Sequence, residues 1–275
     1  MRKNQKAAGI LRWVIIALLI FFSLAPILFV IGTAFKPTNE IYSLSLIPKA
    51  PTLSNYRNVF RNDSMLRYFL NTAIVSAFTT VLSMVVATLG AYGFSRYKFP
   101  GAGGIIGFIM FTRVLPRVTI IIPFYVTLSK LRLLNTYPGL ILVYLMVVMP
   151  VTIWMLKGFF DGIPHEIEEA AAIDGCSPLR MLFRVVLPIC LPALAAVGMY
   201  AFILSWNEFL FALIMTGDKA TRPISVGLAF YIDETGVHWG ELMAASALMS
   251  VPAVIVFSLS QNMLVKGLSA GAVKG

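Results

Sequence analysis

The sequence contains few charged residues. Only 12% of its 275 residues are Asp, Glu, Lys or Arg, whereas 59% are hydrophobic and the mean hydropathy is +0.85. Soluble domains carry about 25% charged residues, so this composition excludes an ordinary soluble domain. It predicts an all-α, polytopic membrane protein with about six transmembrane helices of roughly 20 to 25 residues.

Histidine, cysteine and nucleotide-binding patterns are also scarce. The two histidines, His165 and His238, are too far apart in sequence to form a metal site with the cysteines. Cys176 and Cys190 fall in a loop and in an apolar run, so no disulfide is expected. No G-x-x-x-x-G-K-[ST] loop and no serine nucleophile elbow occur. The chain is therefore expected to be no enzyme and to hold no cofactor or metal of its own.

The formal net charge of +10 raises the question of a nucleic-acid partner. The basic residues are scattered at the ends of apolar runs and are not interleaved with aromatic residues, so no nucleic acid is expected. Anionic headgroups of membrane lipid are the expected counter-charge.

Apolar runs predict six spans, at about residues 13–35, 69–94, 103–128, 139–160, 185–215 and 241–264. Basic residues before the first run place the N-terminus, and with an even number of spans the C-terminus, in the cytoplasm. Basic residues also occur in the predicted external segments, so the orientation depends mainly on the N-terminal tail. The predicted regions are a tail with the first helix (1–36), an external segment (37–68), a transmembrane domain (69–265) with a charged loop (161–184), and a C-terminal tail (266–275).

The second run carries small residues at three- and four-residue steps, which predicts a closely packed helix face. These residues are Ala73, Ser76, Thr80, Ser83, Ala87 and Gly90.

The segment Ile163 to Pro188 concentrates acidic residues between two long apolar runs. Pro164 suits the first turn of a helix, and Gly175 suits a left-handed stop. Ser177 and Pro178 then suit the start of a second helix. We expect a short helix at about 164–174 whose small apolar face docks against a partner, because a helix of this length is marginal alone. A solvated acidic loop is the alternative.

The same segment resembles the EAA signature of permease subunits in bacterial ABC importers, on Glu169-Ala170-Ala171, Gly175 and Leu187-Pro188. Val185 replaces the usual isoleucine of that signature. The residues around this signature, and the C-terminal sequence KGLSAGAVKG, are similar to those of the carbohydrate branch of the family, the maltose-type permeases.

This resemblance implies the type I ABC importer permease fold in the bacterial inner membrane. It also implies a sugar or sugar derivative as solute, a second homologous permease, an extracytoplasmic solute-binding protein, and two ATPase subunits that bind ATP and Mg. In that family the segment is a coupling helix seated in a groove of the ATPase. The residues assigned to this coupling are Glu166, Glu169, Ala170, Ala171, Asp174, Gly175 and Pro188.

Other solutes, such as an amino acid or a polyol phosphate, remain open because the signature reports the ATPase interface. An ion-coupled secondary transporter is a more distant alternative. The segment Thr216 to Trp239 is expected to be a polar external loop, either a contact for the binding protein or a solvated connector.

Charges inside the apolar runs form a second candidate site. Arg113 and Arg117 flank Pro116. Asn207 and Glu208 lie within the sequence SWNEF, a motif that is also common in carbohydrate permeases. Charge within hydrocarbon is costly and commonly functional. These residues either line the translocation path or have a structural role, in which Glu208 neutralises Arg113 or Arg117.

Overall fold

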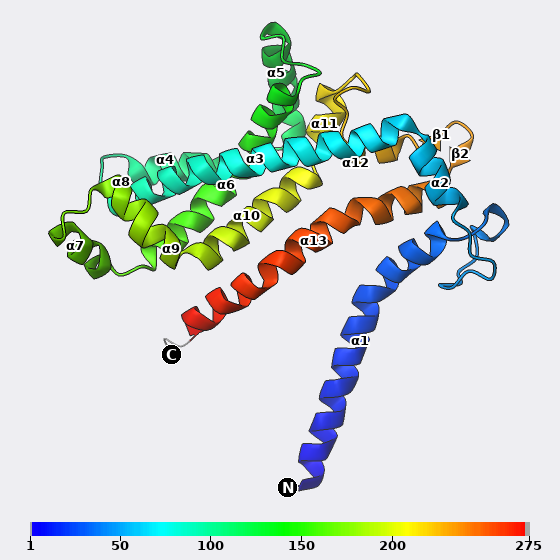
Figure 1. The fold of residues 1–275 in the computed structure, drawn as a ribbon, viewed down its shortest axis with the longest axis horizontal. Coiled ribbons are helices and arrows are strands. Elements are labelled where there is room, and N and C mark those ends of the chain that lie inside the picture. Colours follow the sequence, from blue (N-terminus) through cyan, green and yellow to red (C-terminus); the bar gives the residue numbers. More distant parts are fainter. Residues whose placement is uncertain (1, 273–275) are drawn as a thin grey trace. The chain divides into compact units, whose positions relative to one another are not determined.

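A computed structural model gives the fold, and it describes the backbone of residues 2–272 and the side chains of residues 9, 11–62 and 64–261. Helices dominate the described chain, and its one sheet is a two-stranded hairpin (Figure 1). The predicted all-α class is confirmed. The chain divides into two compact units: unit 1 comprises residues 1–66 and 228–251, and unit 2 comprises residues 67–227 and 252–275.

The helices and strands follow one another along the chain as labelled in Figure 1. The first half contains α1 (Arg2–Ala34), the 3₁₀-helix η1 (Thr38–Glu40), α2 (Ser54–Arg61), α3 (Asp63–Arg96), α4 (Ala102–Phe111), α5 (Arg117–Lys130) and α6 (Tyr137–Asp161). The second half contains α7 (His165–Ile173), α8 (Pro178–Met181), the π-helix η2 (Leu182–Val186), α9 (Leu187–Ile189), α10 (Leu191–Trp206), α11 (Leu210–Met215), α12 (Ile224–Ala229), β1 (Ile232–Asp233), β2 (Gly236–Val237) and α13 (Trp239–Ala272).

Four described helices are long and apolar enough to cross a membrane, and they lie in α1, α3, α6 and α13. A fifth candidate is the bent pair formed by residues 178–189 and α10. The predicted third span is wrong as a continuous helix, because α4 ends before Pro116 and α5 begins after it. The count of six spans and the orientation of the termini therefore stay predictions. Of the predicted tail at 266–275, the backbone is helical as far as Ala272, and residues 273–275 lie outside the described residues.

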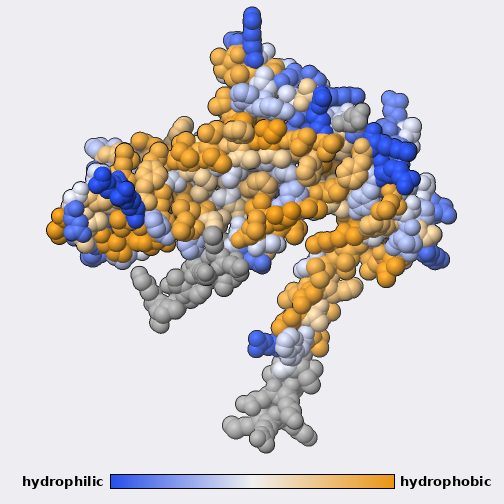
Figure 2. Space-filling model, viewed as in Figure 1, coloured by the Kyte–Doolittle hydropathy of each residue, from blue (hydrophilic) through white to orange (hydrophobic). Residues whose placement is uncertain are grey.

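The sides of the long helices expose large apolar residues (Figure 2). On α1, Trp13 is 71% exposed and Phe22 is 81% exposed. Apolar surface of this extent is normally covered by lipid or by a partner, which agrees with a polytopic membrane protein.

Unit 1 holds the predicted external segment and a buried lysine. The ammonium group of Lys36 donates to the carbonyl oxygen of Ser43 at 2.6 Å and lies 4.9 Å from the ring centroid of Phe29. The Asn55 side-chain amide donates to the carbonyl oxygens of Ala34 and Lys36, each at 2.9 Å. These contacts order the chain between α1 and α2.

Unit 2 contains two apolar clusters. One joins α3, α6, η2 and α10 through residues such as Ala87, Leu156 and Val186. The other joins α3, α5, α6, α11 and α12 through residues such as Val75 and Phe211. The small residues of α3 are buried or half-buried, so the predicted packed face is confirmed. Each cluster supports one of the candidate sites.

The segment Thr216 to Trp239 is not a uniform polar loop. Residues 224–227 at the start of α12 are buried, and the amide of Ile224 donates to the hydroxyl of Thr72 at 2.8 Å. A Cβ added at Gly227 would lie 2.4 Å from the ring of Tyr68, so only glycine fits this approach. The solvated-connector alternative is therefore wrong for this part of the segment.

Candidate functional site

Helix α7 forms where the local sequence predicted a helix. It begins after Pro164 and ends at a Schellman motif, in which Gly175 adopts a left-handed φ of +79°. The amide of Cys176 donates to the carbonyl of Ala171, and the amide of Gly175 donates to that of Ala172, both at 3.0 Å. Ser177 is the N-cap of α8, as predicted. The predicted helix bounds differ from the observed ones by one residue at each end.

One acidic side chain of α7 points inward. Glu168 is 7% exposed and accepts a hydrogen bond from the hydroxyl of Tyr92 at 2.7 Å. Its other oxygen forms an ion pair with the guanidinium of Arg96, which also donates to the carbonyl of Ile163 at 3.2 Å. The Arg96 and Glu168 side chains are only 6% and 9% exposed. Removing one partner of such a pair leaves a buried charge, so the pair fixes α7 to the end of α3.

A second contact joins the ends of α3 and α6. Asp161 accepts a hydrogen bond from Ser95 at 2.7 Å and pairs with Lys157 at 2.6 Å. The end of α3, which holds α7, is therefore also tied to the end of α6.

The opposite face of α7 is exposed within the part of the chain that the structure describes. Residues three and four apart share a helix face, and this face carries both charge and a large apolar side chain, Ile173, which is 87% exposed. The residues assigned to coupling that are exposed here are Glu166, Glu169, Ala170, Asp174 and Gly175. Ala171 is half-buried, and Pro188 is exposed but lies in α9, beyond the loop.

The chain leaves the loop through a bent element. Residues 178–189 and α10 meet at 85° around Cys190. Pro188 and Pro192 lack the backbone N–H that a continuous helix needs, and the π-helix η2 precedes them. The predicted span at 185–215 is therefore wrong as one helix, because it is bent at Cys190 and interrupted again after Trp206.

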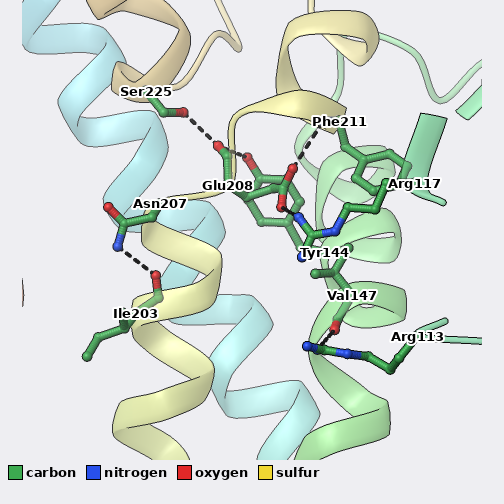
Figure 3. Close-up of polar contacts among 9 residues, drawn as sticks. All are labelled: Arg113, Arg117, Tyr144, Val147, Ile203, Asn207, Glu208, Phe211 and Ser225. Atoms are coloured by element: carbon green, nitrogen blue, oxygen red, sulfur yellow. Dashed lines mark hydrogen bonds and ion pairs between the residues drawn. The ribbon is translucent and has the colours of Figure 1, made fainter. Parts of the chain in front are cut away.

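The second candidate site lies where α4, α5, α10 and α11 end or begin (Figure 3). Glu208, in the break between α10 and α11, has a side chain only 4% exposed. One of its carboxylate oxygens pairs with Arg117 at 3.1 Å, and the other accepts the amide of Phe211 at 3.1 Å. Its backbone carbonyl accepts the hydroxyl of Ser225 at 2.7 Å. Of the two arginines that could neutralise Glu208, the structure pairs it with Arg117.

Arg113 and Asn207 lie outside this pair. Arg113 donates to the backbone carbonyl of Val147 at 3.3 Å, and Asn207 donates to that of Ile203 at 2.9 Å (Figure 3). Both side chains are exposed. Arg113 and Arg117 border a cavity of about 290 Å³ whose walls include Phe124.

Residues 80–270 match the family described as binding-protein-dependent transport system inner membrane component. The chain belongs to this family. It is 33% identical over 267 residues to the sulfoquinovosyl glycerol transport system permease protein SmoH of Agrobacterium fabrum, covering 96% of this chain and 94% of that protein. It is 31% identical over 266 residues to the trehalose transport system permease protein SugB of Mycobacterium tuberculosis, covering 96% and 97%.

Among solved structures, the chain resembles one from a bacterial ABC transporter involved in the import of the acidic polysaccharide alginate. The TM-score is 0.79 at 23% identity, with 94% of this chain and 97% of that chain covered. This likeness confirms the expected permease fold. Family membership makes the chain an inner-membrane transport component and not an enzyme.

Sequence reasoning missed the contacts of Glu168 with Arg96 and Tyr92, which hold α7 in place. Arg96 is 72 residues from Glu168 along the chain. The sequence offered two weak signals for this contact. Arg96 follows the apolar run at 69–94, and Glu168 follows the apolar run at 139–160. Helical phase decides that Glu168, and not its neighbours Glu166 or Glu169, faces inward.

Proposed function

We propose that this chain is the permease subunit of an ATP-driven ABC importer for a sugar or sugar derivative. The named solutes of SmoH and SugB, sulfoquinovosyl glycerol and trehalose, support a sugar-derived solute. The expected complex contains a second permease, two ATPase subunits that bind ATP and Mg, and an external solute-binding protein.

The main support for this proposal is that the two faces of α7 differ in burial. Its inner face is held by the buried pair of Glu168 and Arg96, while its outer face exposes Glu169 and Ile173. A helix of nine residues gains stability mainly by docking. An exposed face on a helix that is already anchored is suited to a partner protein, and the ATPase is the partner that the EAA signature implies.

The proposed mechanism transmits movement of the docked ATPase through α7. The Arg96 contact transfers displacement to α3, and the Schellman turn at Gly175 transfers it to α8 and the bent element that precedes α10. Packed elements with two arrangements can convert such a displacement into alternating access. Glu166, Ala170, Ala171, Asp174 and Pro188 have supporting roles at this contact.

The test is to purify the complex through an affinity tag on this chain and to measure sugar-stimulated ATP hydrolysis. We expect an ATPase subunit to co-purify, and Glu169→Ala to reduce the stimulation. Glu234→Ala is the matched control, because Glu234 is also exposed but lies in the turn of the hairpin, on the predicted external side. A chain that transports sugar in liposomes under an ion gradient, without any ATPase, would contradict the proposal.

A further inference from the structure

The cavity beside Glu208 contains more positive than negative charge. Arg113 and Arg117 both line it, and among the described residues Glu208 is the one acid that pairs with either of them. Both oxygens of Glu208 are engaged, one by Arg117 and the other by the amide of Phe211. Among the described residues, no ion pair joins Glu208 to Arg113.

The two arginines are held differently because of the break at Pro116. Arg113 belongs to the turn that ends α4, where its amide donates to the carbonyl of Met110 at 3.1 Å. Arg117 is the first residue of α5. The break separates the two guanidinium groups, and in Figure 3 that of Arg117 lies against Glu208 while that of Arg113 lies against Val147 on α6.

Most hydrogen-bonding capacity of Arg113 is unused by the described residues. A guanidinium has five N–H donors, and the one hydrogen bond from the Arg113 side chain to a described residue goes to Val147 at 3.3 Å. A cation in an apolar region is costly unless a partner compensates it. The planar fork of arginine matches the paired oxygens of a carboxylate, sulfonate or phosphate.

The remaining walls of the cavity suit the body of a sugar. Its volume is about 290 Å³, near the lower end of the range for small-molecule sites. Phe124 is half-buried and contributes apolar surface for the C–H face of a sugar ring, and Thr112 adds a hydroxyl. The cavity thus combines apolar walls with one cation that is free to bind an anion.

We infer that Arg113 binds an acidic substituent, a carboxylate, sulfonate or phosphate, on the sugar that this permease carries. Arg117 is kept from that role by Glu208. The inference depends on the proposed function, because it names the chemical class of the solute that the importer moves.

The experiment uses the whole importer with its binding protein in liposomes, and measures ATP hydrolysis and uptake. The probes are mono- and disaccharides, each tested as the neutral sugar and as its carboxylate, sulfonate and phosphate forms. We expect an acidic form to stimulate the wild type more than its neutral parent. Arg113→Gln should weaken the response to the acidic form by roughly 10- to 100-fold, the usual effect of losing a charged hydrogen bond.

Arg113→Lys keeps the charge without the fork and should have an intermediate response. Lys130→Gln, at the exposed end of α5, is the matched control and should behave as the wild type. If Arg113→Gln fails to assemble, the response of Arg113→Lys to the acidic form, compared with its response to the neutral parent, decides the question.

A wild type that prefers neutral sugars, or an Arg113→Gln variant with an unchanged response, would overturn the inference and leave the importer function intact. No stimulation by any sugar would overturn the proposed function as well. Liposomes of phosphatidylcholine alone separate the solute from anionic lipid headgroups. If the effect of Arg113→Gln disappears there, the anion is the headgroup of an anionic lipid and the inference is wrong.

Discussion

Two arginine–glutamate pairs in unit 2 differ in how far water reaches them. At the α7 loop, the side chains of Arg96 and Glu168 are 6% and 9% exposed. In the second pair, Glu208, in the break between α10 and α11, is 4% exposed, but Arg117, at the start of α5, is 46% exposed. The first pair is enclosed on both sides, whereas the second is open on its arginine side.

The enclosed pair is suited to holding helices together, whereas the open pair is accessible from outside. The enclosed pair adjoins the apolar cluster of α3, α6, η2 and α10, and it joins α7 to that cluster. The open pair adjoins the cavity of about 290 Å³ that Arg113 and Arg117 line. We therefore propose that the first pair transmits movement and that the region of the second pair contacts the solute.

The largest effect is expected for Glu168→Ala. It leaves the buried Arg96 without its anion, a change that typically costs about 3–5 kcal/mol. The free energy of unfolding, measured in detergent by denaturant titration, should fall by that order.

The double variant Arg96→Met with Glu168→Leu serves as the control. Replacing both charges by apolar groups of similar size is often nearly neutral, so the double variant should regain most of the lost stability. A double variant as unstable as Glu168→Ala alone would show that the pair is not the tie.

A smaller effect is expected for Gly175→Val. No atom lies within 4 Å of an added Cβ, so the cost arises from the positive φ of +79°. A β-branched residue in that conformation costs about 1–3 kcal/mol. Gly175→Asn should be milder because asparagine tolerates the left-handed region. Protease sensitivity of the loop should rise in the order glycine, asparagine, valine, while the amount of protein inserted in the membrane stays constant.

The smallest stability effect is expected at the open pair. Arg117 is nearly half exposed, so water screens its side of the pair, but Arg117→Gln also leaves the carboxylate of Glu208, which is 4% exposed, without its cation. We expect the free energy of unfolding to fall by less than in Glu168→Ala, because the amide of Phe211 still donates to Glu208. The charge swap of Arg117→Glu with Glu208→Arg should transport better than either single variant. A swapped protein no better than the single variants would argue against a functional pair.

Local sequence rules predicted the α7 loop well. The turn at Gly175 and the start of α8 at Ser177 follow from the conformational preferences of a few adjacent residues. The overall fold class followed from composition, because so apolar a chain has few soluble alternatives.

Long-range pairing and the breaks in the spans could not be predicted in this way. Hydropathy averages over a window, so it did not separate α4 from α5 or detect the bend at Cys190, although Pro116 and Pro192 were visible. The burial of Glu168 depends on where α7 packs against α3. That packing involves residues more than 70 positions apart in the sequence.

The most direct test of the central claim measures sugar uptake and ATP hydrolysis in the same proteoliposomes for wild type, Gly175→Asn and Gly175→Val. If α7 transmits movement between the ATPase and the membrane helices, the amount of sugar moved per ATP hydrolysed should fall in that order. If the Gly175→Val complex transports sugar with the wild-type ratio and normal stimulation of ATP hydrolysis, the α7 loop does not couple the two processes.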